Sequence, residues 1–372
     1  MQHPFCDRSE WRAGELIIWV VRTLDVRLHL VTDVDRKAWN TFVSSQPGSN
    51  LFQSYEWGQV RKALGWEPSY LAVADGAEWL GAALVLSRPL PGGFGSLLYS
   101  PRGPILSDYE GNQLEALISA VQQLARHVGG IFWRVEPPIV AERTDGCEQI
   151  ARAGFVQIPQ EWSPWNRPKY EMHLDLGPGE NALFQALGKK DRWSVRSALK
   201  NVHIHSGASG EDLEAFYQLL RHTAMKKRIL IRDVTYYRQC LEELAPFGMI
   251  RIFVARHEGR PVAAGISTRF GQTAMLLHMS NDYSVANAGW AIQWEMIKWA
   301  IAEGCSVYDF AGTGTSYPPK ETDKGYGVYQ FKLSFGAKIV VWYGYADYVY
   351  RPGAYKIFRA FEQCVPYGEQ MF

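Results

Sequence analysis

Residues 70–86 read YLAVADGAEWLGAALVL, and residues 252–267 read IFVARHEGRPVAAGIS. In each stretch two runs of apolar residues flank a short polar turn, which contains Gly76 in the first and Gly259 in the second. Apolar runs of this length around a glycine-containing turn are typical of a β-hairpin. The pattern therefore predicts one hairpin in each half of the chain, and it indicates an internal repeat.

The segments after each hairpin repeat as well. An apolar segment comes first, then an amphipathic helix that ends at glycine, a common helix C-terminal signal, and then a strand. In the first half these segments are residues 97–99, 114–128 and 131–135, and in the second half 274–277, 291–303 and 306–310. Two copies of this order predict an α/β (α+β) protein with two tandem GNAT-like acyltransferase domains from an internal duplication.

The length of 372 residues exceeds what one hydrophobic core usually supports, which agrees with two domains. The repeat sets their expected limits. We expect residues 1–25 to be an N-terminal extension, residues 26–168 to form the first domain and residues 169–337 the second, with residues 338–372 completing the first.

Many acetyl-CoA enzymes share this architecture and hold the cofactor pyrophosphate with backbone N–H groups of a loop that opens a helix. The corresponding residues 286–291 read ANAGWA. Gly289 and Ala291 fit the loop pattern. Ala286, however, stands where Arg or Gln is wanted, and Trp290 is bulky. Because the match is partial, an acyl-CoA-dependent N-acyltransferase remains one alternative.

Charge and cysteine content narrow the classes of partner. The 39 Lys+Arg and 38 Asp+Glu give a net charge of +1, so contact with a polyanion must come from local patches. The 5 cysteines are far apart and form no CxxC pair, which argues against zinc and against a disulfide framework. We expect no metal and a cytoplasmic location. The apolar run at residues 16–21 is too short to span a bilayer, and its charged flank does not suit a signal peptide.

Six further segments stand in one order between residues 26 and 360. They are residues 52–61 (FQSYEWGQVR), 99–104 (YSPRGP), 190–200 (KDRWSVRSALK), 232–236 (RDVTY), 308–312 (YDFAG) and 328–332 (VYQFK). Together they resemble the Fem (FemABX) family of peptidoglycan bridge-forming aminoacyltransferases, although no single segment is diagnostic. The resemblance implies transfer of an amino acid from aminoacyl-tRNA, as co-substrate and without a further cofactor, to the stem-peptide amine of a peptidoglycan precursor by direct aminolysis.

The family's muropeptide pocket falls on three positions of this chain. Its basic residue falls on Arg61, where family members often have lysine, and its Arg and Tyr fall on Arg232 and Tyr236. The implied substrate carries phosphates, to which arginine offers fixed bidentate donors. Other interpretations are a solvated helix residue for Arg61 and a salt bridge for Arg232. Tyr236 could be a core residue, since Tyr237 offers another register.

The pair Phe331-Lys332 resembles the family's site for the aminoacyl-tRNA end. Attack of an amine on an ester carbonyl gives a tetrahedral oxyanion, and a fixed cation beside that oxygen lowers the barrier. We therefore expect Lys332 to be catalytic, with Phe331 beside it. The alternation in residues 330–333 predicts a strand with Phe331 and Leu333 on one side. Lys332 could then be a solubility charge on a strand edge, and Phe331 a core residue.

Two more titratable residues are candidates. On the strand after the second hairpin, where family members can place tyrosines, this chain has Leu276 and His278. His278 could replace a phenol as a hydrogen-bonding or proton-shuttling group, or it could be a satisfied core residue. Asp309, at the end of the strand before Gly312, could orient the amine or hold the strand end.

A basic stripe is expected on one helix. Residues 186–232 hold ten Lys or Arg and four Asp or Glu, and Arg192, Arg196 and Lys200 recur every four residues. This spacing puts the three on one helix face. The stripe suits tRNA phosphates, and Trp193 beside it could stack on an unpaired nucleotide. The alternative is a solvated face with Trp193 packed inward.

The expected partners are aminoacyl-tRNA and a muropeptide acceptor, either lipid II or UDP-MurNAc-pentapeptide. A lipid-linked acceptor would bring this protein, expected to be a cytoplasmic monomer, into peripheral contact with the inner membrane face. The sequence contains no nucleophile elbow with a Ser-His-Asp order, no HExxH and no Walker loop. A non-catalytic protein that binds tRNA or a wall precursor is the alternative from another class.

Overall fold

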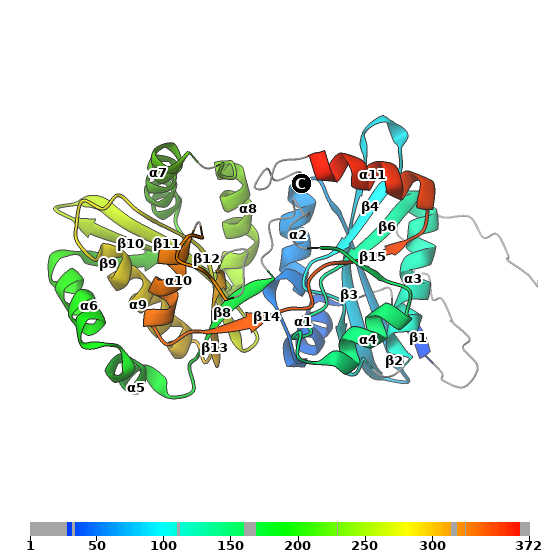
Figure 1. Cartoon of the computed structure of the whole chain (residues 1–372), viewed down its shortest axis with the longest axis horizontal. Coiled ribbons are helices and arrows are strands. Elements are labelled where there is room, and N and C mark those ends of the chain that lie inside the picture. Colours follow the sequence, from blue (N-terminus) through cyan, green and yellow to red (C-terminus); the bar gives the residue numbers. More distant parts are fainter. Residues whose placement is uncertain are drawn as a thin grey trace, which may run out of the picture.

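The computed structural model describes the backbone of residues 28–31 and the whole of residues 34–109, 112–159, 169–228, 230–313, 318–323 and 325–364. The expected N-terminal extension, residues 1–25, lies outside the described residues. The described part forms two α/β halves, each built on one mixed sheet, which lie side by side along the long axis of the molecule (Figure 1). Within it, every helix is too short or too polar to cross a membrane.

The first sheet has eight strands among the described residues, and the first predicted hairpin forms its second and third strands from one edge. In sheet order they are β1 (Leu28–Val31), β2 (Glu67–Asp75), β3 (Glu78–Pro89), β4 (Ser96–Ser100), β6 (Gly130–Val135), β15 (Ala346–Val349) and β7 (Val156–Gln157), while β5 (Ile105–Leu106) pairs with β3. β2 and β3 pair in antiparallel register from Glu67 opposite Ser87 to Asp75 opposite Glu78. The hairpin prediction is confirmed.

The second sheet has seven strands in the part of the chain that the structure describes, and it contains the second predicted hairpin. In sheet order they are β14 (Lys338–Val341), β8 (Tyr170–Asp175), β13 (Val307–Gly312), β12 (Thr273–Asn281), β11 (Arg260–Phe270), β10 (Ile250–His257) and β9 (His203–Gly207). Both residues of the β10–β11 turn, Glu258 and Gly259, have positive φ, at 49° and 77°. A two-residue turn of this kind matches the right-handed twist of the strands that it joins.

Each sheet has one parallel pair at its centre, and the two pairs differ. β4 pairs with β6 along its whole length. β12 pairs with β13 only from Thr273 opposite Val307 to Met275 opposite Asp309. Beyond these residues β12 and β13 no longer pair, whereas β4 and β6 stay paired to the end of β4.

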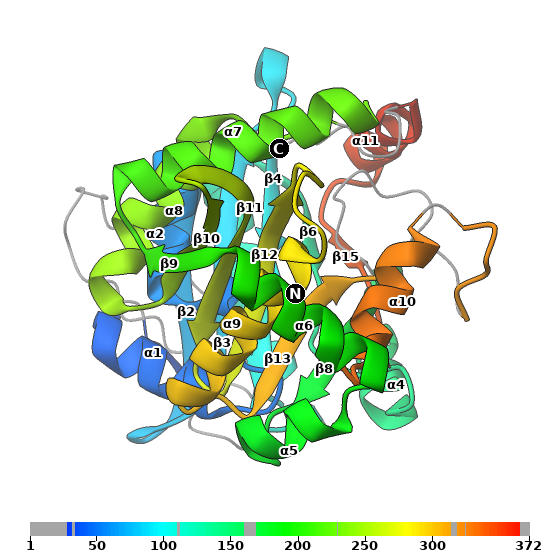
Figure 2. The same cartoon turned by 90° about the vertical axis from the view of Figure 1, so that its left-hand side faces the viewer.

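Helices cover both faces of both sheets. They are α1 (Arg36–Ser45), α2 (Tyr55–Ala63), α3 (Gln113–Val128), α4 (Thr144–Arg152), α5 (Gly179–Ala186), α6 (Lys189–Asn201), α7 (Gly210–Lys227), α8 (Val234–Leu244), α9 (Ala288–Ala302), α10 (Tyr326–Ser334) and α11 (Pro352–Cys364), with 3-10 turns at Leu51–Gln53, Pro91–Gly93 and Ala245–Phe247. α3 and α4 cover the face of the first sheet that points away from the second half. α5, α6 and α9 cover the face of the second sheet that points away from the first half (Figures 1 and 2). Between the sheets α2 packs against α8, so one apolar cluster continues from Trp57 to Tyr237 and joins the halves.

The C-terminal segment crosses from the second sheet to the first. We expected residues 338–372 to belong to the first domain, but β14 pairs with β8 of the second sheet, whose edge it completes. β15 and α11 do lie on the first sheet. There the buried Arg134 of β6 pairs with Asp347 of β15 at 2.7 Å and with Glu362 of α11. Buried charges persist only when they are paired, so this triad fixes the C-terminal segment on the first sheet.

Candidate active site

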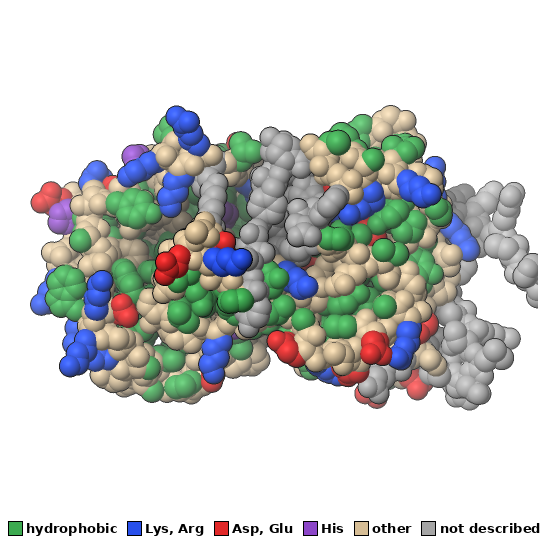
Figure 3. Space-filling view, in the orientation of Figure 1, with side chains coloured by type: hydrophobic (Ala, Val, Ile, Leu, Met, Phe, Trp, Pro, Cys, Tyr) green, Lys and Arg blue, Asp and Glu red, His purple; other side chains and the backbone are tan. Residues whose placement is uncertain are grey.

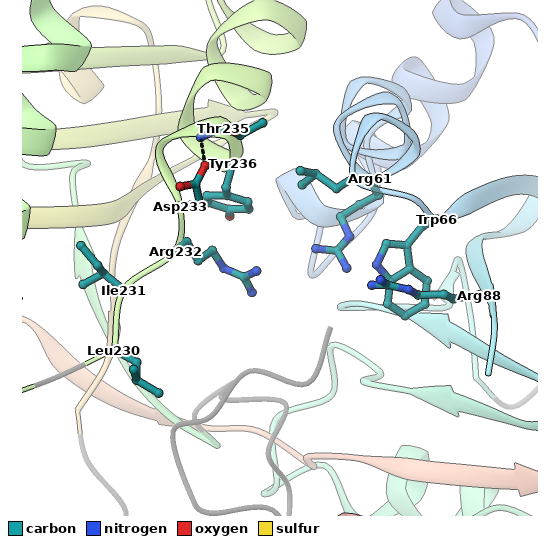
Figure 4. A pocket seen from close by; sticks show the side chains of 10 residues that line it. Arg61, Trp66, Arg88, Leu230, Ile231, Arg232, Asp233, Thr235 and Tyr236 are labelled. Carbon is teal, nitrogen blue, oxygen red and sulfur yellow. Dashed lines mark hydrogen bonds between the residues drawn. The ribbon is translucent and has the colours of Figure 1, made fainter. Parts of the chain in front are cut away.

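A cavity of about 400 Å³, which we call the interdomain cavity, lies between the two halves near the ends of α2 and α8 that face each other (Figures 1 and 4). It brings together side chains from distant parts of the sequence. They are Arg61, Leu64, Trp66, Arg88, Leu230, Ile231, Arg232, Asp233, Thr235 and Tyr236. Three of the sequence candidates, Arg61, Arg232 and Tyr236, therefore meet here.

The arginines of the interdomain cavity are held by aromatic rings. Figure 4 shows the guanidinium groups of Arg61 and Arg232 pointing into the same space from opposite sides. The Cζ atom of Arg61 lies 4.9 Å from the ring centroid of Trp66, and that of Arg232 lies 4.6 Å from the ring centroid of Tyr236. Stacking of this kind fixes the plane of a guanidinium group, which is the donor geometry that a phosphate accepts. Arg61 is 7% exposed, so the interpretation as a solvated residue is wrong.

The described residues that line this cavity carry more positive than negative charge. Arg88 is the third arginine, with its Cζ atom 5.7 Å from the Trp66 ring. Asp233 is the one carboxylate among the described residues that line this cavity, and it accepts the Thr235 N–H at 2.9 Å as the N-cap of α8. A hydrogen bond from the Thr235 side chain, and then this N–H bond, lower the pKa of Asp233. Three cations around one carboxylate that already caps a helix favour binding of a phosphate.

A second and larger cavity, of about 800 Å³, opens where β12 and β13 diverge; we call it the β12–β13 cavity. Residues of α7, β12, α9, β13 and α10 line it, among them His278, Phe331 and Lys332. None of the described residues that line it is a carboxylate. A buried cation in its wall is therefore available to a ligand rather than neutralised within the cavity.

Lys332 supplies that cation. It is 4% exposed, and its Nζ donates hydrogen bonds to the Ala311 carbonyl, at 3.1 Å, and to the Gly312 carbonyl. Burial lowers its pKa to about 8, against the opposing effect of the carboxylates of Asp309 and Glu171. Lys332 is therefore mostly protonated at pH 7.

Lys332 lies on a helix, so the predicted strand at residues 330–333 is wrong. Phe331 and Phe335, four residues apart, both have ring centroids 5.0 Å from that of Trp290, a contact that requires helical spacing. Leu333 is 44% exposed, while Phe331 lines the β12–β13 cavity. A four-residue alternation is too short to distinguish a strand from a helix.

Aromatic rings lie between the two cavities. Tyr237 is fully buried, and its ring centroid is 5.1 Å from that of Tyr236, which lines the interdomain cavity. On its other side it is 5.6 Å from the ring of His278, which lines the β12–β13 cavity. Burial and then the Arg232 charge lower the pKa of His278 to about 4. The imidazole is neutral at pH 7 and a weak base, so hydrogen bonding suits it better than proton transfer.

Asp309 does not line the β12–β13 cavity. It lies in a buried charge cluster on the other side of its strand, with Arg102, Glu171 and His173. Burial, with help from Glu171, raises its pKa to about 6, and its Oδ1 accepts the Ala311 N–H at 2.7 Å. Because the Ala311 carbonyl binds Lys332, Asp309 holds the backbone behind the lysine rather than facing a substrate amine.

The same cluster contains metal-type donor atoms. Those of Glu171, His173 and Asp309 lie within 4.8 Å of one another. Arg102 nevertheless forms an ion pair with Glu171 and donates to it, so a cation already occupies this group. Burial alone would raise the pKa of Glu171, but Arg102 holds it at about 2.

The basic stripe lies on α6 as predicted, although only part of it faces solvent. Arg196 and Lys200 are exposed, whereas Arg192 donates back to the carbonyls of Gln185 and Leu187. Trp193 is 63% exposed, so the alternative in which it packs inward is wrong. α6 packs on α9, whose first turns line the β12–β13 cavity.

Some cavity residues were not found by sequence reasoning. Lys227 lines the β12–β13 cavity, and the Nζ atoms of Lys226 and Lys227 lie 5.3 and 5.8 Å from the ring of Tyr283, which also lines it. Figure 3 shows Lys and Arg side chains gathered over α7. Gln293, fully buried in the apolar helix α9, gave no sequence signal. The run Lys226 to Arg228 was visible only as part of a wider basic count.

Comparisons with known proteins agree with this arrangement. A family model described as the FemAB family matches residues 34–255, and one described as an acetyltransferase (GNAT) domain matches residues 185–332. A lipid II:glycine glycyltransferase of Staphylococcus saprophyticus is 22% identical over 393 aligned positions, which cover 87% of this chain and 94% of the relative. A protein of the same name from Staphylococcus aureus is 20% identical, with coverage of 86% and 92%.

Solved structures show the same fold. A structure described as FemX superposes with a TM-score of 0.80 at 19% identity, covering 88% of this chain and 98% of that one. A tandem GNAT protein from the clavulanic acid biosynthesis pathway superposes with a TM-score of 0.53 at 12% identity, with coverage of 87% and 98%. The predicted tandem acyltransferase fold is confirmed.

Proposed function

This chain belongs to the FemAB family, and on that premise we propose that it is an aminoacyltransferase that moves an amino acid from aminoacyl-tRNA to the stem-peptide amine of a peptidoglycan precursor. The observation that carries the proposal is the pair of neighbouring cavities. One contains arginines suited to phosphate, and the other contains a buried lysine suited to an oxyanion. The names of the relatives support lipid II as the acceptor, and its nucleotide-linked precursor carries the same phosphates and peptide.

The interdomain cavity would bind the acceptor. Arg61 and Arg232 would hold its phosphates with charge-assisted hydrogen bonds, and Tyr236 would contact the adjoining sugar. The stem peptide would then extend past Tyr237 towards His278. This path brings the amine to the cavity that contains Lys332.

The β12–β13 cavity would bind the aminoacyl end of the tRNA. The amine nitrogen attacks the ester carbonyl, a C–N bond forms, and the carbonyl oxygen becomes an oxyanion beside the Lys332 ammonium. Collapse of the intermediate breaks the C–O bond of the ester, and the ribose oxygen leaves as a hydroxyl with the proton that the attacking nitrogen gives up. Positioning of the two substrates and stabilisation of the oxyanion supply the rate, with no covalent enzyme intermediate.

The tRNA body would lie across the basic surface of the second half. Arg196 and Lys200 on α6 are exposed, and Trp193, one turn before Arg196, is also exposed. Phosphate contacts from such residues position an RNA without reading its sequence, and an exposed ring can stack on an unpaired base.

The acceptor would be met at a membrane surface. On the outer face of α11 one stripe at helical spacing is exposed, formed by Ile357, Ala360, Phe361 and Cys364. Lys356 is exposed beside it, and the only carboxylate of the helix, Glu362, is buried. A helix with an apolar stripe and a basic flank suits an anionic lipid surface. Figures 1 and 2 place α11 and the turn of the β3–β4 hairpin at the same end of the molecule, and Arg88 of the interdomain cavity lies at the end of β3, just before that turn.

The structure bears on both alternatives, a non-catalytic binding protein and an acyl-CoA-dependent enzyme. A non-catalytic binding protein would be favoured if Lys332 lay away from any cleft, but Lys332 lines the larger cavity. An acyl-CoA-dependent enzyme is favoured by the GNAT match and by the start of α9 lining the same cavity. Against it, Trp290 stands in the pyrophosphate loop and packs on Phe331 and Phe335.

Calorimetric titration with UDP-MurNAc-pentapeptide tests the acceptor site. Because a lost hydrogen bond to a charged group costs about 1.5 to 3 kcal/mol, Arg61→Ala and Arg232→Ala should each weaken binding about 10- to 150-fold. Arg238→Ala, which removes an exposed arginine from the same helix end, is the matched control and should bind as the parent does. Parental affinity in both cavity variants would place the acceptor elsewhere.

A further inference from the structure

One wall of the β12–β13 cavity holds polar atoms without partners. Gln293 of α9 is fully buried, and its Oε1 accepts no hydrogen bond from any described residue. Ser280 of β12 is 3% exposed, and its Oγ is likewise without a partner among the described residues. Both residues line the cavity. A buried acceptor left without a donor is costly, so a ligand that brings a donor is expected to satisfy it.

A chain of hydrogen bonds fixes the orientation of the Gln293 amide. Its Nε2 donates to the Tyr308 Oη at 3.0 Å, Tyr308 hydrogen-bonds the Ser267 side chain, and the Ser267 Oγ donates to the Met275 carbonyl at 3.1 Å. The Met275 carbonyl can only accept, so the Ser267 hydroxyl must donate to it. The Tyr308 hydroxyl then donates to Ser267, and the Gln293 amide nitrogen donates to Tyr308. The amide nitrogen of Gln293 is used in this chain, and the carbonyl oxygen remains as the acceptor.

We propose that Gln293 Oε1, together with Ser280 Oγ, binds the α-ammonium group of the aminoacyl donor and so selects acyl groups that carry a free amine. This inference rests on the proposed function and names the specificity of its donor site. In an aminoacyl ester the α-ammonium is bonded to the carbon next to the reacting carbonyl, and it has three N–H donors. A buried amide oxygen and a hydroxyl supply two acceptors for them.

The same contacts position the reacting carbonyl. Lys332 and Gln293 both line this cavity, with Lys332 presenting a cation to the ester oxygen and Gln293 an acceptor to the amine. An acetyl group, or an N-acetylated aminoacyl group, leaves the Gln293 oxygen without its donor. A site built to hydrogen-bond a group rejects analogues that lack it more strongly than an apolar pocket rejects a change of size.

The test uses the whole protein and two stable ligands, 3′-deoxy-3′-(alanylamino)adenosine and its N-acetyl derivative, measured by calorimetry. Because a hydrogen bond to a charged group is lost, we expect the parent to bind the free-amine ligand about 10- to 100-fold more tightly than the N-acetyl ligand. Gln293→Met, which keeps length and removes the acceptor, should abolish this preference and leave the affinity for the N-acetyl ligand unchanged. Gln293→Glu keeps an acceptor for the ammonium group of the ligand, and the Tyr308 hydroxyl can donate to the new carboxylate. This variant should therefore retain the preference.

The possible results distinguish a failure of the Gln293 role from a failure of the proposed aminoacyltransferase function. If neither ligand binds the parent protein, the aminoacyl-tRNA function itself is contradicted. If the parent binds both ligands equally, or if folded Gln293→Met keeps the preference, the function stands and the role of Gln293 is wrong. If Gln293→Met does not fold, Ser280→Ala decides: a several-fold loss confined to the free-amine ligand supports the site, and an equal loss for both ligands overturns it.

Discussion

Replacing Lys332 by methionine should lower kcat while leaving the protein folded. Methionine keeps the length and apolar volume of the lysine stem and deletes the charge. In the parent, the Lys332 Nζ lies in the cavity wall, bound to two backbone carbonyls and to no carboxylate among its described hydrogen-bond partners. Removal of one oxyanion-stabilising group typically costs about 100- to 1000-fold in kcat, or about 2.7 to 4 kcal/mol. The KM values should change little, because the interaction forms mainly in the transition state.

The same lysine gives a stability signature with a definite sign. Folding lowers its pKa from 10.5 to about 8, so between these values the unfolded chain binds more protons than the native protein. The cost of the buried charge, about 3 kcal/mol, is therefore fully present below pH 8 and disappears as pH rises towards 10.5. Relative to Lys332→Met, the parent should gain about this much unfolding free energy over that interval.

Steady-state transfer from aminoacyl-tRNA to muropeptide, with urea unfolding from pH 7 to 10.5, measures both effects. Lys338→Met removes an exposed lysine just beyond the same helix and is the matched control. It should leave both the rate and the pH dependence as in the parent. A folded Lys332→Met enzyme with parental kcat would refute the catalytic role, and a change confined to the KM for tRNA would make Lys332 an RNA contact only.

Three further expectations follow from the surface and from the pH dependence. Changing Arg196 and Lys200 together to glutamine should reduce the slope of log affinity for tRNA against log salt concentration by about 1.5, as measured by filter binding. An unchanged slope would show that these two residues are solvated and do not contact the tRNA phosphates. Changing Ile357 and Phe361 together to serine should lower co-sedimentation with vesicles containing anionic phosphatidylglycerol about tenfold or more. Turnover of the soluble nucleotide-linked acceptor should stay unaltered. Equal co-sedimentation of the variant and the parent would show that α11 does not contact the membrane. Parental kcat should fall as pH rises above 8, because Lys332 then loses its proton, and a rate that keeps rising to pH 10 would argue against a cation at the oxyanion.

The elements with long, repeated patterns could be predicted from the sequence. Both hairpins, the helices that became α3 and α9 and the strands after them lie where the apolar periodicity and the glycines predicted. Local patterns were less reliable. The short alternation around Lys332 predicted a strand, whereas the contacts of its neighbours with Trp290 hold a helix.

The candidate site could be predicted only in part. The positions of Arg61 and Arg232 came from a family resemblance, since nothing in their spacing shows that two halves of the chain meet there. Asp309 was placed by its strand end, but the direction of its side chain depends on Arg102 and Glu171, which are remote in sequence. Gln293 stands out only once its hydrogen-bond partners are known, because a single glutamine in an apolar helix has no sequence signature.

The central claim is transfer of an aminoacyl group from tRNA to a wall precursor. The most direct measurement incubates the purified protein with a mixed pool of isotopically labelled aminoacyl-tRNAs and either lipid II or UDP-MurNAc-pentapeptide, and follows the acceptor by mass spectrometry. We expect the stem peptide to gain the mass of one labelled aminoacyl residue, and we expect no product when the tRNA is deacylated or replaced by acetyl-CoA. An acceptor of unchanged mass with every aminoacyl-tRNA, or acylation from acetyl-CoA in the absence of tRNA, would contradict the claim.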